Sequence, residues 1–114
     1  MALKTSLRSL AKRIALAVQA AVRRESEALT KKYRLFGTYE AESDHISLVL
    51  QILGDVDDLR LYTAVFEELR RAFPHDPFIP NSVGLVIRHV SNEDEMGAFA
   101  YWPEAEEDIS HLLQ

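Results

Sequence analysis

Residues 46–74 have the sequence ISLVLQILGDVDDLRLYTAVFEELRRAFP, and its hydrophobic period changes halfway along. In residues 46–53 apolar side chains alternate, which is the period of a β-strand with one well-buried face. Ser47, Val49, Gln51 and Leu53 lie on the opposite face, which we expect to be partly covered. The face that we expect in the core comprises Ile46, Leu48, Leu50 and Ile52.

The second half of this stretch has a helical period. From Leu59 onward apolar residues recur every three or four positions, which predicts an amphipathic helix. Asp55 is a candidate cap for its first turn, and Pro74 ends it. The face that we expect in the core comprises Leu59, Tyr62, Val65, Phe66, Leu69 and Phe73.

Downstream of Pro74 the pattern predicts a second hairpin. Residues 83–90 are apolar on both faces apart from Arg88 and His89, which is typical of a central strand. Residues 91–95 predict a turn, and residues 96–102 predict a fourth strand. Pro103 then begins a short last helix with acidic residues in its first turn.

Upstream, residues 1–32 contain neither Gly nor Pro and predict one long basic amphipathic helix. At 1.5 Å per residue, residues 3–32 would span about 45 Å, whereas a compact domain of this length is roughly 34 Å across. Part of the apolar stripe would overhang, so we expect a homodimer through this helix. The candidate dimer interface comprises Leu3, Leu7, Leu10 and Ile14.

Between this helix and residue 46, the aromatic-rich residues 33–39 predict a strand, and the polar residues 40–44 predict a hairpin loop. The expected order is therefore helix–hairpin–helix–hairpin–helix. This order predicts a single α+β domain over residues 1–114, with a four-stranded antiparallel sheet and the helices packed on one face.

Charge is unevenly distributed along the 114 residues. Residues 1–34 contain nine Lys or Arg and two Glu, a net charge of +7, whereas residues 35–114 have a net charge of −12. The basic helix can pack across the acidic body of the same chain or of a second copy, or it can meet nucleic acid or an anionic surface. The acidic body can instead bind a basic protein. Candidate residues for that acidic interface are Glu93, Asp94 and Glu95, together with the acidic residues from Glu104 to Asp108.

Several classes of function lack their motifs. The chain has no Cys, which excludes disulfides, thiol catalysis and thiolate zinc sites. Glycine-rich phosphate loops, nucleophile elbows and paired-His helix motifs are also missing from the sequence. We expect neither a metal site nor a cofactor, and no apolar run is long enough to span a membrane.

One candidate pocket remains. Arg88 and His89 on a strand that we expect to be central must be paired or line a cavity. Together with Tyr101 they form a candidate small-molecule or catalytic pocket between sheet and helices. The alternative is that this end of the strand reaches solvent.

We therefore expect a cytoplasmic, non-enzymatic protein-interaction module, such as an adaptor, chaperone or inhibitor, that is dimeric and has an acidic surface. One alternative is a small-molecule-binding domain or enzyme with its pocket near Arg88 and His89. A second alternative is a nucleic-acid-associated protein that uses the basic N-terminal helix. Residues 1–24 also have the Arg-rich, acid-free composition of a transit peptide, although we favour the first helix of the folded domain.

Overall fold

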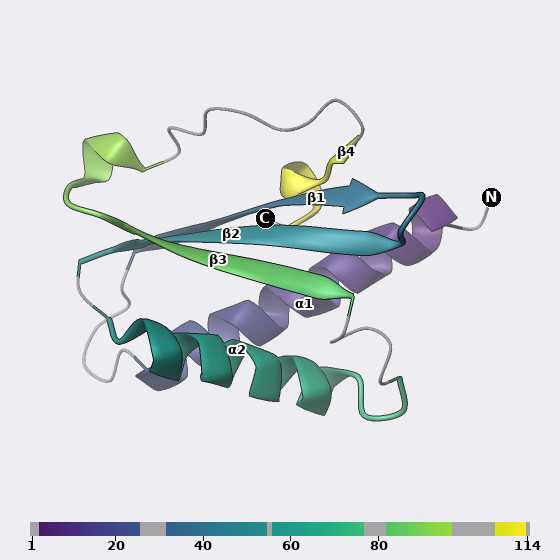
Figure 1. Ribbon diagram of the computed structural model, residues 1–114, viewed down its shortest axis with the longest axis horizontal. Helices are drawn as coiled ribbons and strands as arrows, with labels where there is room; N and C mark the ends of the chain where they lie inside the picture. The colour runs from purple at the N-terminus through teal and green to yellow at the C-terminus, as the bar shows by residue number, and fades with distance from the viewer. Residues whose placement is uncertain (1–2, 26–31, 55, 77–81, 97–106, 114) are drawn as a thin grey trace.

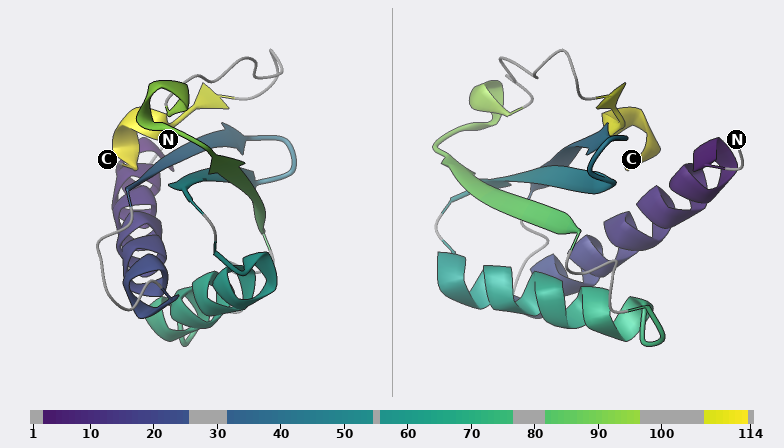
Figure 2. Two further views of the ribbon diagram at one scale, coloured as in Figure 1. Left: turned by 90° about the vertical axis from the view of Figure 1, so that its left-hand side faces the viewer. Right: turned by 45° about the vertical axis from the view of Figure 1, so that its right-hand side comes forward.

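Two α-helices lie against one face of a four-stranded sheet in the computed structural model of this chain (Figures 1 and 2). The structure describes residues 3–25, 32–54, 56–76, 82–96 and 107–113. It confirms the α+β class. The elements in chain order are α1 (Leu3–Glu25), β1 (Tyr33–Glu40), β2 (His45–Leu53), α2 (Asp58–Ala72), β3 (Val83–Val90), the 3-10 helix η1 (Glu93–Glu95), β4 (Glu107–Asp108) and the 3-10 helix η2 (Ser110–Leu112).

The sheet is mixed, with the strand order β3-β2-β1-β4. β1 and β2 form the predicted antiparallel hairpin, from Tyr33 opposite Ile52 to Glu40 opposite His45. β2 and β3, in contrast, are parallel, so the prediction of a fully antiparallel sheet is wrong. The reason is that α2 connects them: a chain that leaves a strand, runs back along a helix and re-enters the same sheet returns in the original direction.

β3 is an edge strand rather than the predicted central strand. The central positions belong to β1 and β2, because the short strand β4 pairs with Thr38 and Tyr39 on the outer side of β1. The predicted fourth strand, residues 96–102, lies outside the described residues except for Met96.

The predicted last helix is wrong over the residues that the structure describes. Residues 107–108 form β4, and residues 110–112 form only one 3-10 turn. Residues 103–106 of that predicted helix lie outside the described part of the chain. The two apolar residues Ile109 and Leu113 are nevertheless buried, so this short segment still contributes to the core.

The core lies between the two helices and one face of the sheet. The predicted inward face of β2, from Ile46 to Ile52, is at most 4 % exposed, which confirms the strand period. α1 contributes Leu7, Ile14 and Val18, all buried in the same cluster. α1 ends at Glu25, so its 23 residues span about 34 Å rather than the expected 45 Å.

Candidate functional site

One flank of α2 is apolar but not covered. Leu59 is 75 % exposed and Tyr62 is 44 % exposed, whereas the buried residues of this helix are Leu61, Ala64, Val65 and Leu69. The prediction that Leu59 and Tyr62 belong to the core face is therefore wrong. Tyr62 instead packs on the half-buried Phe66, with ring centroids 4.8 Å apart.

The edge strand β3 lies beside this flank. Among the described residues, the carbonyls of Ser82 and Val90 accept hydrogen bonds from the β2 side of the sheet. Because backbone groups alternate in direction along a strand, the even-numbered residues of β3 face β2 and the odd-numbered residues face outward. Val83, Leu85 and Ile87 thus present N–H and C=O groups along an edge with which no described strand pairs.

Apolar side chains continue from α2 onto this edge. Val86 is 60 % exposed on the sheet face opposite the helices, and Ile87 closes a pocket of about 340 Å³ together with Asp58, Leu59 and Tyr62. We call this surface the α2–β3 edge. It comprises Leu59, Tyr62, Phe66, Val86 and Ile87.

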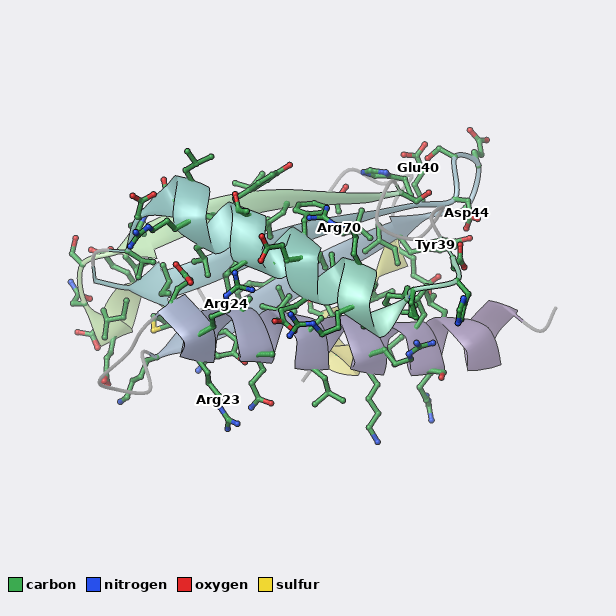
Figure 3. All side chains as sticks on the ribbon, turned by 90° about the horizontal axis from the view of Figure 1, so that it is seen from below. Arg23, Arg24, Tyr39, Glu40, Asp44 and Arg70 are labelled. Carbon is green, nitrogen blue, oxygen red and sulfur yellow. The ribbon has the colours of Figure 1, made fainter. Side chains whose placement is uncertain are left out.

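Opposite charges lie at the two ends of the α2 flank. Asp58 is in the first turn of α2, and its carboxylate contacts Nε2 of His89. Arg70 is exposed in the last turn, on the flank of α2 that faces away from α1 (Figure 3). The helix itself begins after Asp57, whose side chain accepts a hydrogen bond from the backbone N–H of Arg60; the predicted cap, Asp55, lies outside the described residues.

The structure does not bring together the three residues of the predicted small-molecule pocket. Arg88 and His89 are consecutive in β3, so their side chains point to opposite faces of the sheet. Nδ1 of His89 lies 2.9 Å from the carbonyl oxygen of Gly54, which ties the end of β3 to the start of the α2 segment. Tyr101 lies outside the described residues, and this pocket stays a prediction.

The predicted interface on α1 is largely covered within the chain. Leu7 and Ile14 are buried in the core, and Leu10 is half-buried against it; the side chain of Leu3 lies outside the described part. Packing within the chain thus explains the apolar stripe of α1. Residues 7–24 belong to the folded domain, because their apolar side chains pack in its core.

Part of the predicted acidic interface on η1 is used locally. Glu93 forms an ion pair with Lys32, and Glu95 binds the backbone N–H of Ser91 and the side chain of Asn92. Asp94 is exposed and, among the described residues, has no ion-pair partner.

A second group of carboxylates lies at the end of the β1–β2 hairpin, and sequence reasoning missed its members other than Glu107 and Asp108. The phenol of Tyr39 donates a hydrogen bond of 2.7 Å to Oδ1 of Asp44. This bond, burial and the negative charges of Asp44 and Glu107 together raise the pKa of Tyr39. We call this surface the acidic sheet end; it comprises Glu40, Glu42, Asp44, Glu107 and Asp108, and no described ion pair neutralises any of them.

The basic residues of α1 divide into two groups. Arg24 pairs with Glu67 and Glu68 of α2, and the guanidinium of Arg13 lies 4.1 Å from the Phe73 ring centroid. The remaining described cations, Arg8, Lys12 and Arg23, are exposed and have no ion pair with any other described residue. Figure 3 shows Arg24 between the helices and Arg23 directed away from α2.

Within the described ranges, no group of three or more His, Asp or Glu is placed to hold a metal ion. No helix of this part of the chain is long and apolar enough to cross a bilayer. Two grooves lined by described residues are larger than the pocket at Ile87: one of about 570 Å³ between α1 and β1, and one of about 550 Å³ beside Arg13 and Phe73.

Comparison of the chain with protein-family models, with curated proteins and with solved structures found no match.

Proposed function

We propose that this chain is a protein-interaction module and that the α2–β3 edge is its binding surface. The observation that carries the proposal is that three of the four exposed large hydrophobic residues in the described part of the chain, Leu59, Tyr62 and Val86, lie on this one edge. Leu59 and Tyr62 lie on the helix side of β3 and Val86 lies on the other face, so a partner at this edge would cover all three. Exposed apolar patches usually mark sites of association.

The strand beside this apolar surface supports the same function. An edge strand that presents unpaired N–H and C=O groups is a template for another strand, and monomeric proteins commonly protect such edges with Pro, bulges or charges at the strand centre. β3 has none of these at its centre, where the sequence is Leu85-Val86-Ile87. A partner strand here would gain backbone hydrogen bonds and would also cover apolar side chains.

Charge supports a preference among partners. Residues 35–114 have a net charge of −12, and the acidic sheet end contains five of their carboxylates, none of which has a described ion pair. Such a negative field raises the association rate with basic proteins, and the increase is smaller at high salt because the charges are screened. We propose that a basic partner binds at the acidic sheet end, apart from the α2–β3 edge; this partner and a cytoplasmic location remain part of the proposal.

A photo-crosslinking experiment tests the binding surface. We would place benzoylphenylalanine at position 62, or at position 16 on α1 as a control that is at least as accessible, and irradiate each protein in a lysate of its source organism. We expect a discrete adduct from position 62 only, and Val86→Lys in the labelled chain should reduce it. Identical adducts from both positions, or none from position 62, would contradict the proposal.

The exposed cations of α1 favour a second, weaker candidate function, the binding of nucleic acid. Arg8, Lys12 and Arg23 lie along one helix and are not neutralised by described residues, which is the arrangement that binds phosphate groups. Arg13 is less suitable for this role, because it contacts the carbonyl of Ala72 and the Phe73 ring.

A further inference from the structure

We infer that the partner on the α2–β3 edge is a second copy of this chain. The two copies would be related by a two-fold axis, with the β3 strands paired antiparallel and the α2 flanks packed against each other. This inference rests on the proposed function, because it names the partner for that same surface. The predicted homodimer is thereby assigned to α2 and β3 instead of α1.

The strand itself is compatible with two-fold pairing. With the axis at Val86, Leu85 of one copy lies opposite Ile87 of the other, so outward-facing backbone groups meet. Arg88 then lies opposite Gly84, and no two like charges are directly opposed along the eight residues. The side chains of Val86 from the two copies meet at the axis, which covers the most exposed apolar residue of the strand.

The helix flank has the same symmetry. With a two-fold axis beside the exposed flank, at the height of Ala64 along the helix, position 62 faces position 66 and position 58 faces position 70 of the other copy. Tyr62 of one copy therefore meets Phe66 of the other, and the Asp58 carboxylate meets the Arg70 guanidinium. The flank has an acid at one end and a base at the other. An antiparallel copy of the same helix would therefore form two equivalent contacts between opposite charges.

The two axes coincide, which is the strongest argument for a second copy. Tyr62 and Ile87 line one pocket, so these positions lie side by side. α2 runs antiparallel to β3, since Asp58 at its start contacts His89 near the end of β3. From Tyr62 to Ala64 is about 3 Å along a helix, and from Ile87 to Val86 is about 3.3 Å along a strand. One axis thus serves both elements.

Sedimentation equilibrium of the full chain tests the inference first. We expect a species of twice the chain mass of 13.0 kDa that dissociates on dilution. Val86→Lys places two like charges at the axis and should raise the dissociation constant by at least about tenfold. Leu16→Lys, at a site with 55 % exposure compared with 60 % for Val86, makes the same change elsewhere and should leave the dimer intact.

A cysteine variant tests the axis directly, because the natural chain has no Cys. In Val86→Cys the two sulfurs would belong to a non-hydrogen-bonded pair, whose Cα separation of about 4.5 Å is within the range for a disulfide. We expect mild oxidation to give a disulfide-linked dimer with Val86→Cys and none with Leu16→Cys. Equal crosslinking of both variants, or a purified wild-type chain that is monomeric at every concentration, would overturn the inference. If the position-62 adduct still forms in lysate, the proposed function stands with a different partner; if it does not, both fail.

Discussion

Gly37 lies where the C-terminal segment crosses β1. Its carbonyl accepts from the backbone N–H of Ile109, and its N–H donates to Oγ of Ser110. A Cβ at position 37 would lie only 2.7 Å from Cδ1 of Leu113 and 3.0 Å from Cδ2 of Leu48. Both are buried side chains, so Gly37→Ala forces the core to repack and should lower the free energy of unfolding by about 1–3 kcal/mol. Urea unfolding measures this loss.

Gly84→Ala is the matched control for this prediction. A Cβ at position 84 would meet only the ring of His45, at 3.2 Å, and that side chain is half-buried and able to move. We expect a change below about 0.5 kcal/mol. If both substitutions had the same cost, close approach of the C-terminal segment would not explain the glycine at position 37.

The Tyr39–Asp44 hydrogen bond predicts a dependence of stability on alkaline pH. The bond raises the pKa of Tyr39 above its ordinary value of 10.0, so its contribution is fully present below that pH and is lost as the pH rises through the folded-state pKa. Asp44→Asn removes the charge but suits the backbone, because Asn tolerates the positive φ of 52° at this position.

We expect Asp44→Asn to lower the pKa of Tyr39 toward its ordinary value and to flatten the alkaline loss of stability. Ultraviolet titration of tyrosinate measures the first effect, with Tyr39→Phe identifying which of the four tyrosines responds. Glu42→Gln, in the same hairpin loop, is the control and should leave that pKa nearly unchanged. An equal shift in both variants would show that general negative charge, not the hydrogen bond, is the cause.

Individual burial was predictable where one face of an element meets the core. The alternation in β2 identified Ile46 to Ile52 correctly. In α2 the prediction failed at Leu59 and Tyr62, because apolar residues occupy both the core face and the adjoining flank. A helical wheel cannot tell which part of so wide a stripe lies beyond the last strand of the sheet.

At the scale of elements, the two ends of the α2 flank give a prediction about charge. If Asp58 of one copy meets Arg70 of the other, Arg70→Glu replaces two attractions by two repulsions and should weaken the dimer. Raising the salt concentration should bring the dissociation constant of the variant closer to that of the wild type, since salt screens exposed charges. Sedimentation at low and high salt measures both effects.

Arg71→Glu is the control for Arg70→Glu. Arg71 is the next residue, and its substitution by Glu changes the net charge by the same amount. Its guanidinium lies 3.2 Å from the carboxylate of Glu68 in its own helix. It lies on the flank near α1, so we expect its substitution to leave association nearly unaffected. If both substitutions weakened the dimer equally, net charge would control association, and the proposed contact between Asp58 and Arg70 would be contradicted.

The elements themselves were predicted better than their connections. Strands were predicted at residues 33–39, 46–53 and 83–90 and a helix between Asp55 and Pro74, close to the observed β1, β2, β3 and α2, but the parallel crossover through α2 was missed. The apolar character of β3 on both faces was taken as a sign of a central position. In the structure the same pattern belongs to an edge strand, and the proposed second copy would supply the cover that the prediction had assigned to neighbouring strands.

At the scale of the whole molecule, the opposite charges of the two parts of the chain are partly used within it. Arg24 joins α1 to α2 through Glu67, and this contact lowers the pKa of Glu67. Its contribution to stability is therefore present above the ordinary pKa of 4.5 and is lost as the pH falls through the lowered value. The charges left over are the acidic sheet end and the exposed cations of α1, and these decide which macromolecules the module attracts.

The balance between them predicts that the chain does not bind nucleic acid at physiological salt. Arg8, Lys12 and Arg23 supply at most three phosphate contacts, while residues 35–114 carry a net charge of −12 that repels phosphate. Fluorescence anisotropy with labelled duplex DNA should show no saturable binding at about 0.15 M salt. Any binding at low salt should have a log–log salt slope no steeper than about −2.7 and should vanish in Lys12→Glu/Arg23→Glu. Binding that persists at physiological salt, and that this double variant abolishes, would make nucleic acid the primary ligand in place of protein.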